Sequence, residues 1–135
     1  MKKDRRCFIG PAALAVAMSV SAAKAETVEV RSGVNECIVV WTGASGRQEI
    51  NTGIPAPCAI HKTLKGELRV YRDGNRSVVL IETSVPDPSR GEKSCITQIR
   101  ALAYDAQSAT LSKHISRVAS CPPFQWDQKM FTALF

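Results

Sequence analysis

The strongest fold signal in the chain is the stretch ELRVYRDGNRSVVLIET, residues 67–83. Two runs, Glu67–Arg72 and Ser77–Thr83, flank the tetrapeptide Asp73–Arg76. The Asp-Gly pair supplies the backbone freedom that a tight turn needs, because glycine readily adopts positive φ angles. The pattern therefore predicts an antiparallel β-hairpin.

Three further segments have the pattern of strands. Residues Thr27–Arg31 alternate apolar and polar side chains, as a half-buried strand does. Residues Cys37–Trp41 form a short continuous run of β-favouring side chains, which fits a buried strand. A third strand is expected over Cys95–Tyr104. The segments Thr42–Gly46 and Pro86–Gly91 have the composition of a turn and a loop.

Two other segments bear on the helix content. Gly53–Cys58 contains two prolines, which exclude a helix and cannot donate to a strand ladder. Thr110–Ala119 is ambiguous, since its serines suit a strand whereas its leucine, isoleucine and valine have helical spacing. We favour a strand that pairs back across Asp105–Ala109.

The N-terminus has the pattern of an export signal. A basic start precedes the apolar stretch Phe8–Val20, and Ala23-Lys24-Ala25 is the small-x-small pattern that a signal peptidase recognises. The apolar run is too short and too interrupted for a membrane-spanning helix. We expect cleavage between Ala25 and Glu26, which leaves residues 26–135 as one domain without a transmembrane segment. The expected location is the bacterial periplasm, with secretion as the alternative.

The route of export remains open between two pathways. The segment Asp4–Gly10 resembles the twin-arginine motif, because an arginine pair is followed by one variable and two apolar residues. The motif prefers serine or threonine before the arginines, where this chain has Asp4. Twin-arginine export carries folded proteins, so this route would raise the chance of a cofactor or a co-exported partner. The general secretory route is the alternative.

Most of the net charge belongs to the export signal. The whole chain has 18 Lys and Arg against 12 Asp and Glu, a formal net charge of +6. The first 25 residues carry five of these bases and one acid, which leaves 13 bases, 11 acids and a net charge of +2. The mature chain therefore lacks the basic excess that nucleic-acid binding requires. No nucleic-acid partner is expected.

Four cysteines remain after the signal is removed: Cys37, Cys58, Cys95 and Cys121. In an oxidising compartment they most simply form two disulfides, and three pairings are possible. We favour the pairs 37–58 and 95–121, because each closes one local segment and contributes roughly 3 kcal/mol in the chain-entropy model. A metal site is the weaker interpretation, since no C-x2-C pair places two ligands on one turn. No metal or cofactor is expected.

No catalytic motif is found in the chain. It contains no G-x-S-x-G, H-E-x-x-H, P-loop or dinucleotide-binding glycine pattern. Either His61 or His114 could act as a general base, but an ordinary structural histidine is the favoured interpretation of each. The interpretation therefore leans away from an enzyme. A local concentration of bases is interpreted as a solvated face, because Glu67 and Asp73 interrupt it; it comprises Lys62, Lys65, Arg69, Arg72 and Arg76.

The last fifteen residues combine a Pro-Pro break with four of the eight aromatic residues of the chain. Trp126, Met130 and Leu134 share one face at i, i+4 and i+8, which predicts a short amphipathic helix that includes Trp126 and Phe131. Packing of this helix onto the sheet is the favoured interpretation. The alternative is an anchor for a partner protein, because large apolar side chains are typical of interface centres. Its candidate residues are Phe124, Trp126, Met130, Phe131 and Phe135.

Together these patterns predict a mainly β fold. The expected domain is a small antiparallel sheet or sandwich, stapled by two disulfides and completed by a short C-terminal helix; α+β is the alternative. The expected function is a small exported binding protein, such as an inhibitor or immunity protein that acts on an envelope enzyme. The alternatives are a small subunit of an exported redox complex and a structural component of an envelope or secretion assembly.

Overall fold

The computed structural model describes residue 22 and residues 24–135. Nearly all of the expected export signal, residues 1–25, lies outside the described residues. In the described part, no helix has both the length and the apolar character needed to cross a membrane.

The first of two sheets is a three-stranded antiparallel meander of β1 (Thr27–Ser32), β2 (Cys37–Gly43) and β3 (Gly46–Asn51). Strand β2 lies between the other two and is buried along most of its length. The predictions for the first two strands are confirmed. β3 was not predicted, because its side chains are mostly exposed and carry no apolar alternation.

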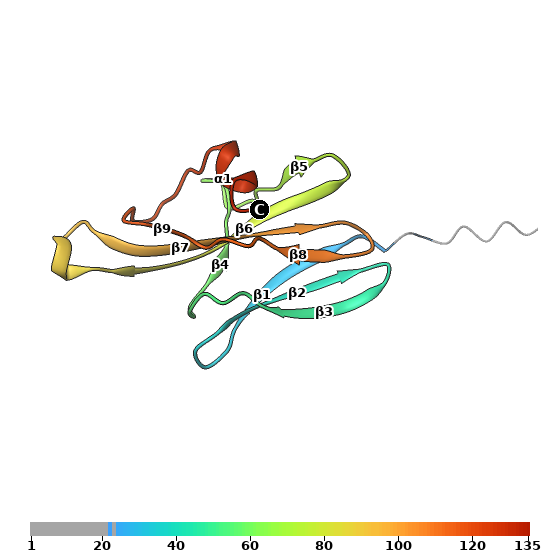
Figure 1. Cartoon of the computed structure of the whole chain (residues 1–135), viewed down its shortest axis with the longest axis horizontal. Coiled ribbons are helices and arrows are strands. Elements are labelled where there is room, and N and C mark those ends of the chain that lie inside the picture. The colour runs from blue at the N-terminus through green and yellow to red at the C-terminus, as the bar shows by residue number, and fades with distance from the viewer. Residues whose placement is uncertain (1–21, 23) are drawn as a thin grey trace, which may run out of the picture.

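The second sheet is built on one long hairpin, in which β6 (Arg76–Pro86) pairs with β7 (Cys95–Tyr104). Four shorter strands extend it on both sides (Figure 1). On the β6 side these are β4 (Ala59–Ile60) and β5 (Tyr71–Asp73), and on the β7 side they are β8 (Ala109–Leu111) and β9 (Ser116–Val118). A 3₁₀ turn, η1 (Pro88–Arg90), connects β6 to β7, and the helix α1 (Gln128–Thr132) follows β9.

Both faces of the second sheet are covered. Successive side chains of β6 point to opposite faces, so alternate residues enter two different cores. Val79 and Ile81 pack toward the first sheet, in a core with Trp41. Val78 and Leu80 pack on the opposite face, in a second core that includes residues of the C-terminal tail. The layers are therefore small sheet, large sheet and tail, and the predicted mainly β fold with two disulfides and one short helix is confirmed.

The hairpin turn is confirmed, but its first arm is shorter than predicted. Asp73 pairs with Arg76 across the turn, and Gly74 has a φ of 60°. β5 begins only at Tyr71, because β4 occupies the edge of β6 farther along: the His61 backbone N–H donates to the Leu80 carbonyl at 2.8 Å. The residues before Tyr71 therefore form a separate loop.

The ambiguous stretch Thr110–Ala119 is extended, as we favoured, but it is divided into β8 and β9. The division lies at Ser112, whose side chain is fully buried. Its hydroxyl accepts from the Ala101 N–H at 3.1 Å and donates to the His114 carbonyl at 3.0 Å. The Ser112 N–H still donates to the Ala101 carbonyl at 2.8 Å, but the Ala101 N–H bonds to the Ser112 side chain in place of its carbonyl, and the ladder is interrupted there.

Three covalent or polar ties join the layers. The disulfides pair Cys37 with Cys58 and Cys95 with Cys121, as the sequence predicts. They indicate an oxidising compartment. Arg100 joins the two sheets, because its Nε donates to the Ser112 carbonyl at 3.0 Å and its Nη1 donates to the Thr52 carbonyl at 2.7 Å.

Gly43 is required at the end of β2 by close packing. A Cβ at this position would lie 2.2 Å from the Trp41 ring and 2.8 Å from the Ala106 carbonyl oxygen. Only glycine allows the buried indole to lie over the strand in this way.

Candidate functional site

The C-terminal tail begins at the disulfide of Cys121 and ends in a helix shorter than predicted. α1 begins after Asp127, whose carboxylate caps the helix by accepting from the Met130 N–H at 3.1 Å. Trp126 therefore precedes the helix, which corrects the prediction that it lies on it. The N-cap fixes this boundary, because aspartate satisfies a free N–H of the first turn.

The structure divides the five partner-binding candidates between the core and the surface. Phe131 is 1% exposed and lies in the core with Leu134 beneath the tail. Trp126 and Met130 are half-buried against the same core. Phe124 is half-buried, and Phe135 is 39% exposed. The tail thus packs on the sheet through its helix and presents Phe124 and Phe135 at the surface.

Trp126 is fixed by a polar cluster that the sequence analysis did not identify. Its indole N–H donates to Glu82 Oε2 at 2.8 Å, and His61 Nδ1 lies 3.4 Å from the same carboxylate group. The His61 ring is almost fully buried and its centroid lies 6.4 Å from that of the indole. A signal was present in the sequence, since Glu82 directly follows the four apolar residues 78–81 of an expected strand, and a charge that is buried in a strand requires a partner.

Phe124 continues this row of rings to the surface. Its ring stacks on Trp126, with the centroids 4.8 Å apart and the planes tilted by 20°. Three adjoining hollows have Phe124 in their walls, with volumes of about 460, 370 and 330 Å³. Phe124 therefore lies at the centre of a groove between the tail and the loop that follows β4.

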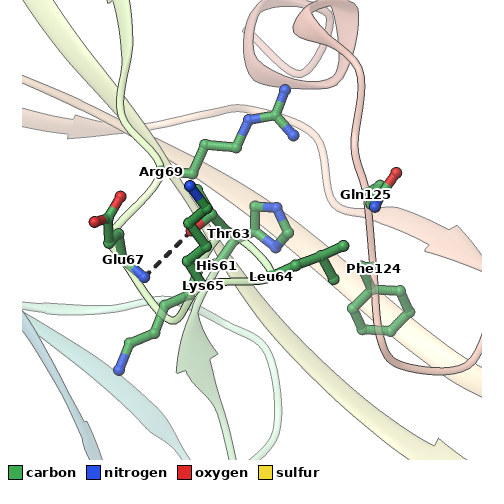
Figure 2. Close-up of a pocket in the computed structure, with 9 residues that line it drawn as sticks. His61, Thr63, Leu64, Lys65, Glu67, Arg69, Phe124 and Gln125 are labelled. Carbon is green, nitrogen blue, oxygen red and sulfur yellow. Dashed lines mark hydrogen bonds between the residues drawn. The ribbon is translucent and has the colours of Figure 1, made fainter.

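The largest hollow is lined by that loop on one side and by Phe124 and Gln125 on the other. Figure 2 shows the buried His61 ring in the middle and Leu64 extending toward Phe124. Leu64 is 67% exposed although it is apolar. The loop is held in shape by its own bonds, because the Glu67 N–H donates to the Thr63 hydroxyl at 3.3 Å and the Thr63 N–H donates to the Glu67 carbonyl at 2.7 Å.

The charged residues predicted as a solvated face fall partly on this hollow. Lys62, Lys65 and Arg69 line it together with one acid, Glu67. Arg69 is held by packing, since its guanidinium lies 5.4 Å from the centre of the Phe131 ring. Arg72 and Arg76 belong to the neighbouring hairpin and do not line the hollow.

Two groups at the turn between β7 and β8 have shifted pKa values. Burial raises the pKa of the Tyr104 phenol above its ordinary value of 10.0. The backbone N–H groups of Gln107 and Ser108 donate to Asp105 and lower the pKa of its carboxyl below 3.8. These bonds close the turn, so the Asp105 shift reflects turn formation.

The two histidines do not come together. His114 is exposed and its backbone N–H donates to the Leu134 carbonyl at 3.1 Å, whereas His61 is buried beneath the tail. In residues 24–135, no three His, Cys, Asp or Glu side chains gather in a cluster that could hold a metal ion. The hollow of about 460 Å³ combines the apolar side chains of Leu64 and Phe124 with three cations and one acid.

Comparison of the chain with protein-family models, curated proteins and solved structures finds no match.

Proposed function

We propose that the mature chain is an exported periplasmic protein that binds a protein partner of the cell envelope, in the manner of an inhibitor or immunity protein. The groove around Phe124 carries this proposal. An exposed leucine and a half-exposed phenylalanine face each other there across an open hollow of about 460 Å³. Apolar and aromatic anchors with a polar rim are typical of the centres of protein interfaces.

The rigidity of the groove supports binding. The Cys95–Cys121 disulfide ties the start of the tail to β7, and the Trp126–Glu82 hydrogen bond ties it to β6. Phe124 stacks on an indole that is therefore already fixed. A surface held in place before binding loses little conformational entropy on association, which favours affinity.

Location in the periplasm is part of the proposal. The export pattern of residues 1–25 and the two disulfides both support a location outside the cytoplasm. An inhibitor is the favoured kind of binding protein, because a small stapled domain without a recognisable catalytic motif can block an enzyme through one rigid surface.

Affinity capture of the mature protein from envelope extract, followed by reconstitution with the purified partner, tests the proposal. We expect one stoichiometric protein partner, and loss of its activity on binding if that partner is an enzyme. Phe124→Ala should weaken capture, whereas the control Val34→Ser, at a side chain 98% exposed on the loop between β1 and β2, should not. Thermal unfolding of both variants checks that they remain folded. Equal capture by wild-type and Phe124→Ala would contradict the assignment of this surface.

A further inference from the structure

We propose that the hollow between Leu64 and Phe124 receives one apolar side chain of the partner, and that carboxylates beside this side chain pair with Lys62, Lys65 and Arg69. The occupant is thus an acidic segment of a protein with an apolar residue at its centre. This inference rests on the proposed function and names the chemistry of the partner.

The shape of the hollow supports an apolar side chain as its occupant. Its open volume of about 460 Å³ has room for an apolar side chain together with the neighbouring residues of its segment. Leu64 and Phe124 supply apolar walls, and Leu64 is 67% exposed in the free protein. Covering these walls removes apolar surface from water, which favours binding.

The charges around the hollow select acidic neighbours. Three cations and one acid line it, and in the described part of the chain none of the three cations is in an ion pair. Lys62 and Lys65 are exposed, so their ammonium groups can move to meet a carboxylate. Arg69 is positioned by its contact with Phe131 and offers a planar donor group for bidentate bonds.

The charges differ between the two ends of the groove. Glu82 lines both smaller hollows, and its side chain is 15% exposed. Lys62 also lines the hollow of about 370 Å³, whereas the hollow of about 330 Å³ has no cation among the described residues of its walls. A carboxylate of the partner is therefore favoured on the loop side of Phe124 and disfavoured on the Glu82 side. An extended segment lying along the groove would place its acidic residues toward Lys65 (Figure 2).

A protein segment fits this surface better than an anionic membrane does. Leu64 and Phe124 face each other across a recess, whereas an interfacial membrane anchor presents one continuous apolar face to the bilayer. Binding to a membrane is therefore an outcome that the test must distinguish.

Titration of the mature, oxidised protein with short capped peptides tests the inference. The first peptide has a central leucine between aspartates; in the others, asparagines or lysines replace the aspartates, or serine replaces the leucine. We expect the first peptide to shift the amide NMR signals of residues 62–69 and of Phe124. The three altered peptides should bind at least about fivefold more weakly at low salt.

Matched variants locate the binding. Lys62→Gln combined with Lys65→Gln should weaken binding of the aspartate peptide at least about fivefold, because both lysines are exposed and neither forms an ion pair with another described residue. Leu64→Ser should weaken it independently of salt. Lys93→Gln, at an exposed lysine of the β6–β7 connection, is the control and should bind as wild type does.

Three results would overturn the inference: equal binding of the aspartate and asparagine peptides, full affinity of the double variant, or binding to anionic vesicles with no peptide binding. The proposed function fails differently. If the aspartate peptide binds in the groove but no envelope protein is captured, the chemistry of the groove holds and the biological partner is wrong. If a protein is captured with full affinity by the double variant, the binding function holds and the acidic segment is wrong.

Discussion

Replacing Arg100 with methionine tests whether its guanidinium joins the two sheets. Methionine has a similar length but no donor, so the variant removes both hydrogen bonds, to the Ser112 and Thr52 carbonyls. A hydrogen bond from a charged group contributes about 1.5–3 kcal/mol. The two bonds together set an upper limit of about 6 kcal/mol.

The expected loss is smaller than this limit. Arg100 is half-buried, so water can partly replace its bonds to the carbonyl oxygens, and removal of the charge also removes its desolvation cost. We expect Arg100→Met to lower the free energy of unfolding by about 2–4 kcal/mol, and the melting temperature by about 8–16 °C for a domain of this size. Arg100→Lys should fall between the variant and wild type, since one ammonium group cannot reach both carbonyls equally well.

Urea and thermal unfolding of the mature, oxidised protein, followed by circular dichroism, measure the effect. Arg117→Met is the matched control, because Arg117 lies exposed on β9; its stability should stay within about 0.5 kcal/mol of wild type. If Arg100→Met also stays within that range, the bonds do not stabilise the packing of the sheets. The denaturant slope should be unchanged, which separates a loss of stability from a change in the unfolded state.

Four other predictions follow from particular residues. Phe131→Ala should cost about 3–5 kcal/mol in urea unfolding, because the ring is 1% exposed, whereas Phe135→Ala should cost much less. Gly43→Ala should destabilise by about 1–3 kcal/mol in the same assay, because its Cβ would overlap the packed indole; wild-type stability would contradict that packing. The pKa of Asp105 is lowered on folding, so its contribution to stability is present above about pH 3.8 and is lost as pH falls through the lower folded value. Asp105→Ala should flatten the acid limb of a stability–pH curve, and an unchanged limb would contradict this. N-terminal sequencing of the protein recovered from a periplasmic extract should begin at Glu26, and a retained signal would refute the predicted cleavage.

The pattern of neighbouring residues was sufficient to predict the turn and the strands whose formation depends on those neighbours. The turn at Asp73–Arg76 depends on glycine, and the strands β1 and β2 follow from neighbouring side chains that alternate or are continuously apolar. The disulfide pairing was also predictable, because each bridge closes a short segment with a sequence separation of 21 or 26 residues. Elements with exposed side chains, such as β3, have no such signal.

The sequence did not resolve whether the tail is core or surface. Its aromatic residues are similar in type, and only the cap at Asp127 and the packing of Phe131 determine which of them is buried. The division of Thr110–Ala119 likewise depends on Ser112, whose partners belong to β7 and to the chain beyond β8. Such tertiary contacts can override the secondary-structure preference of a segment, and which side chains are buried decides the outcome.

The sequence by itself determined the export pattern, the β-rich character and the hairpin turn, because each depends on residues close together in the chain, and it favoured the correct one of three possible cysteine pairings. The tertiary structure alone decided the candidate site. His61 and Glu82 are 21 residues apart, and Glu82 and Trp126 are 44 apart, so their contact depends on how β4, β6 and the tail pack. The groove at Phe124 exists because that packing leaves a hollow between the loop after β4 and the tail. The sequence pattern of neither segment predicts that the two lie side by side.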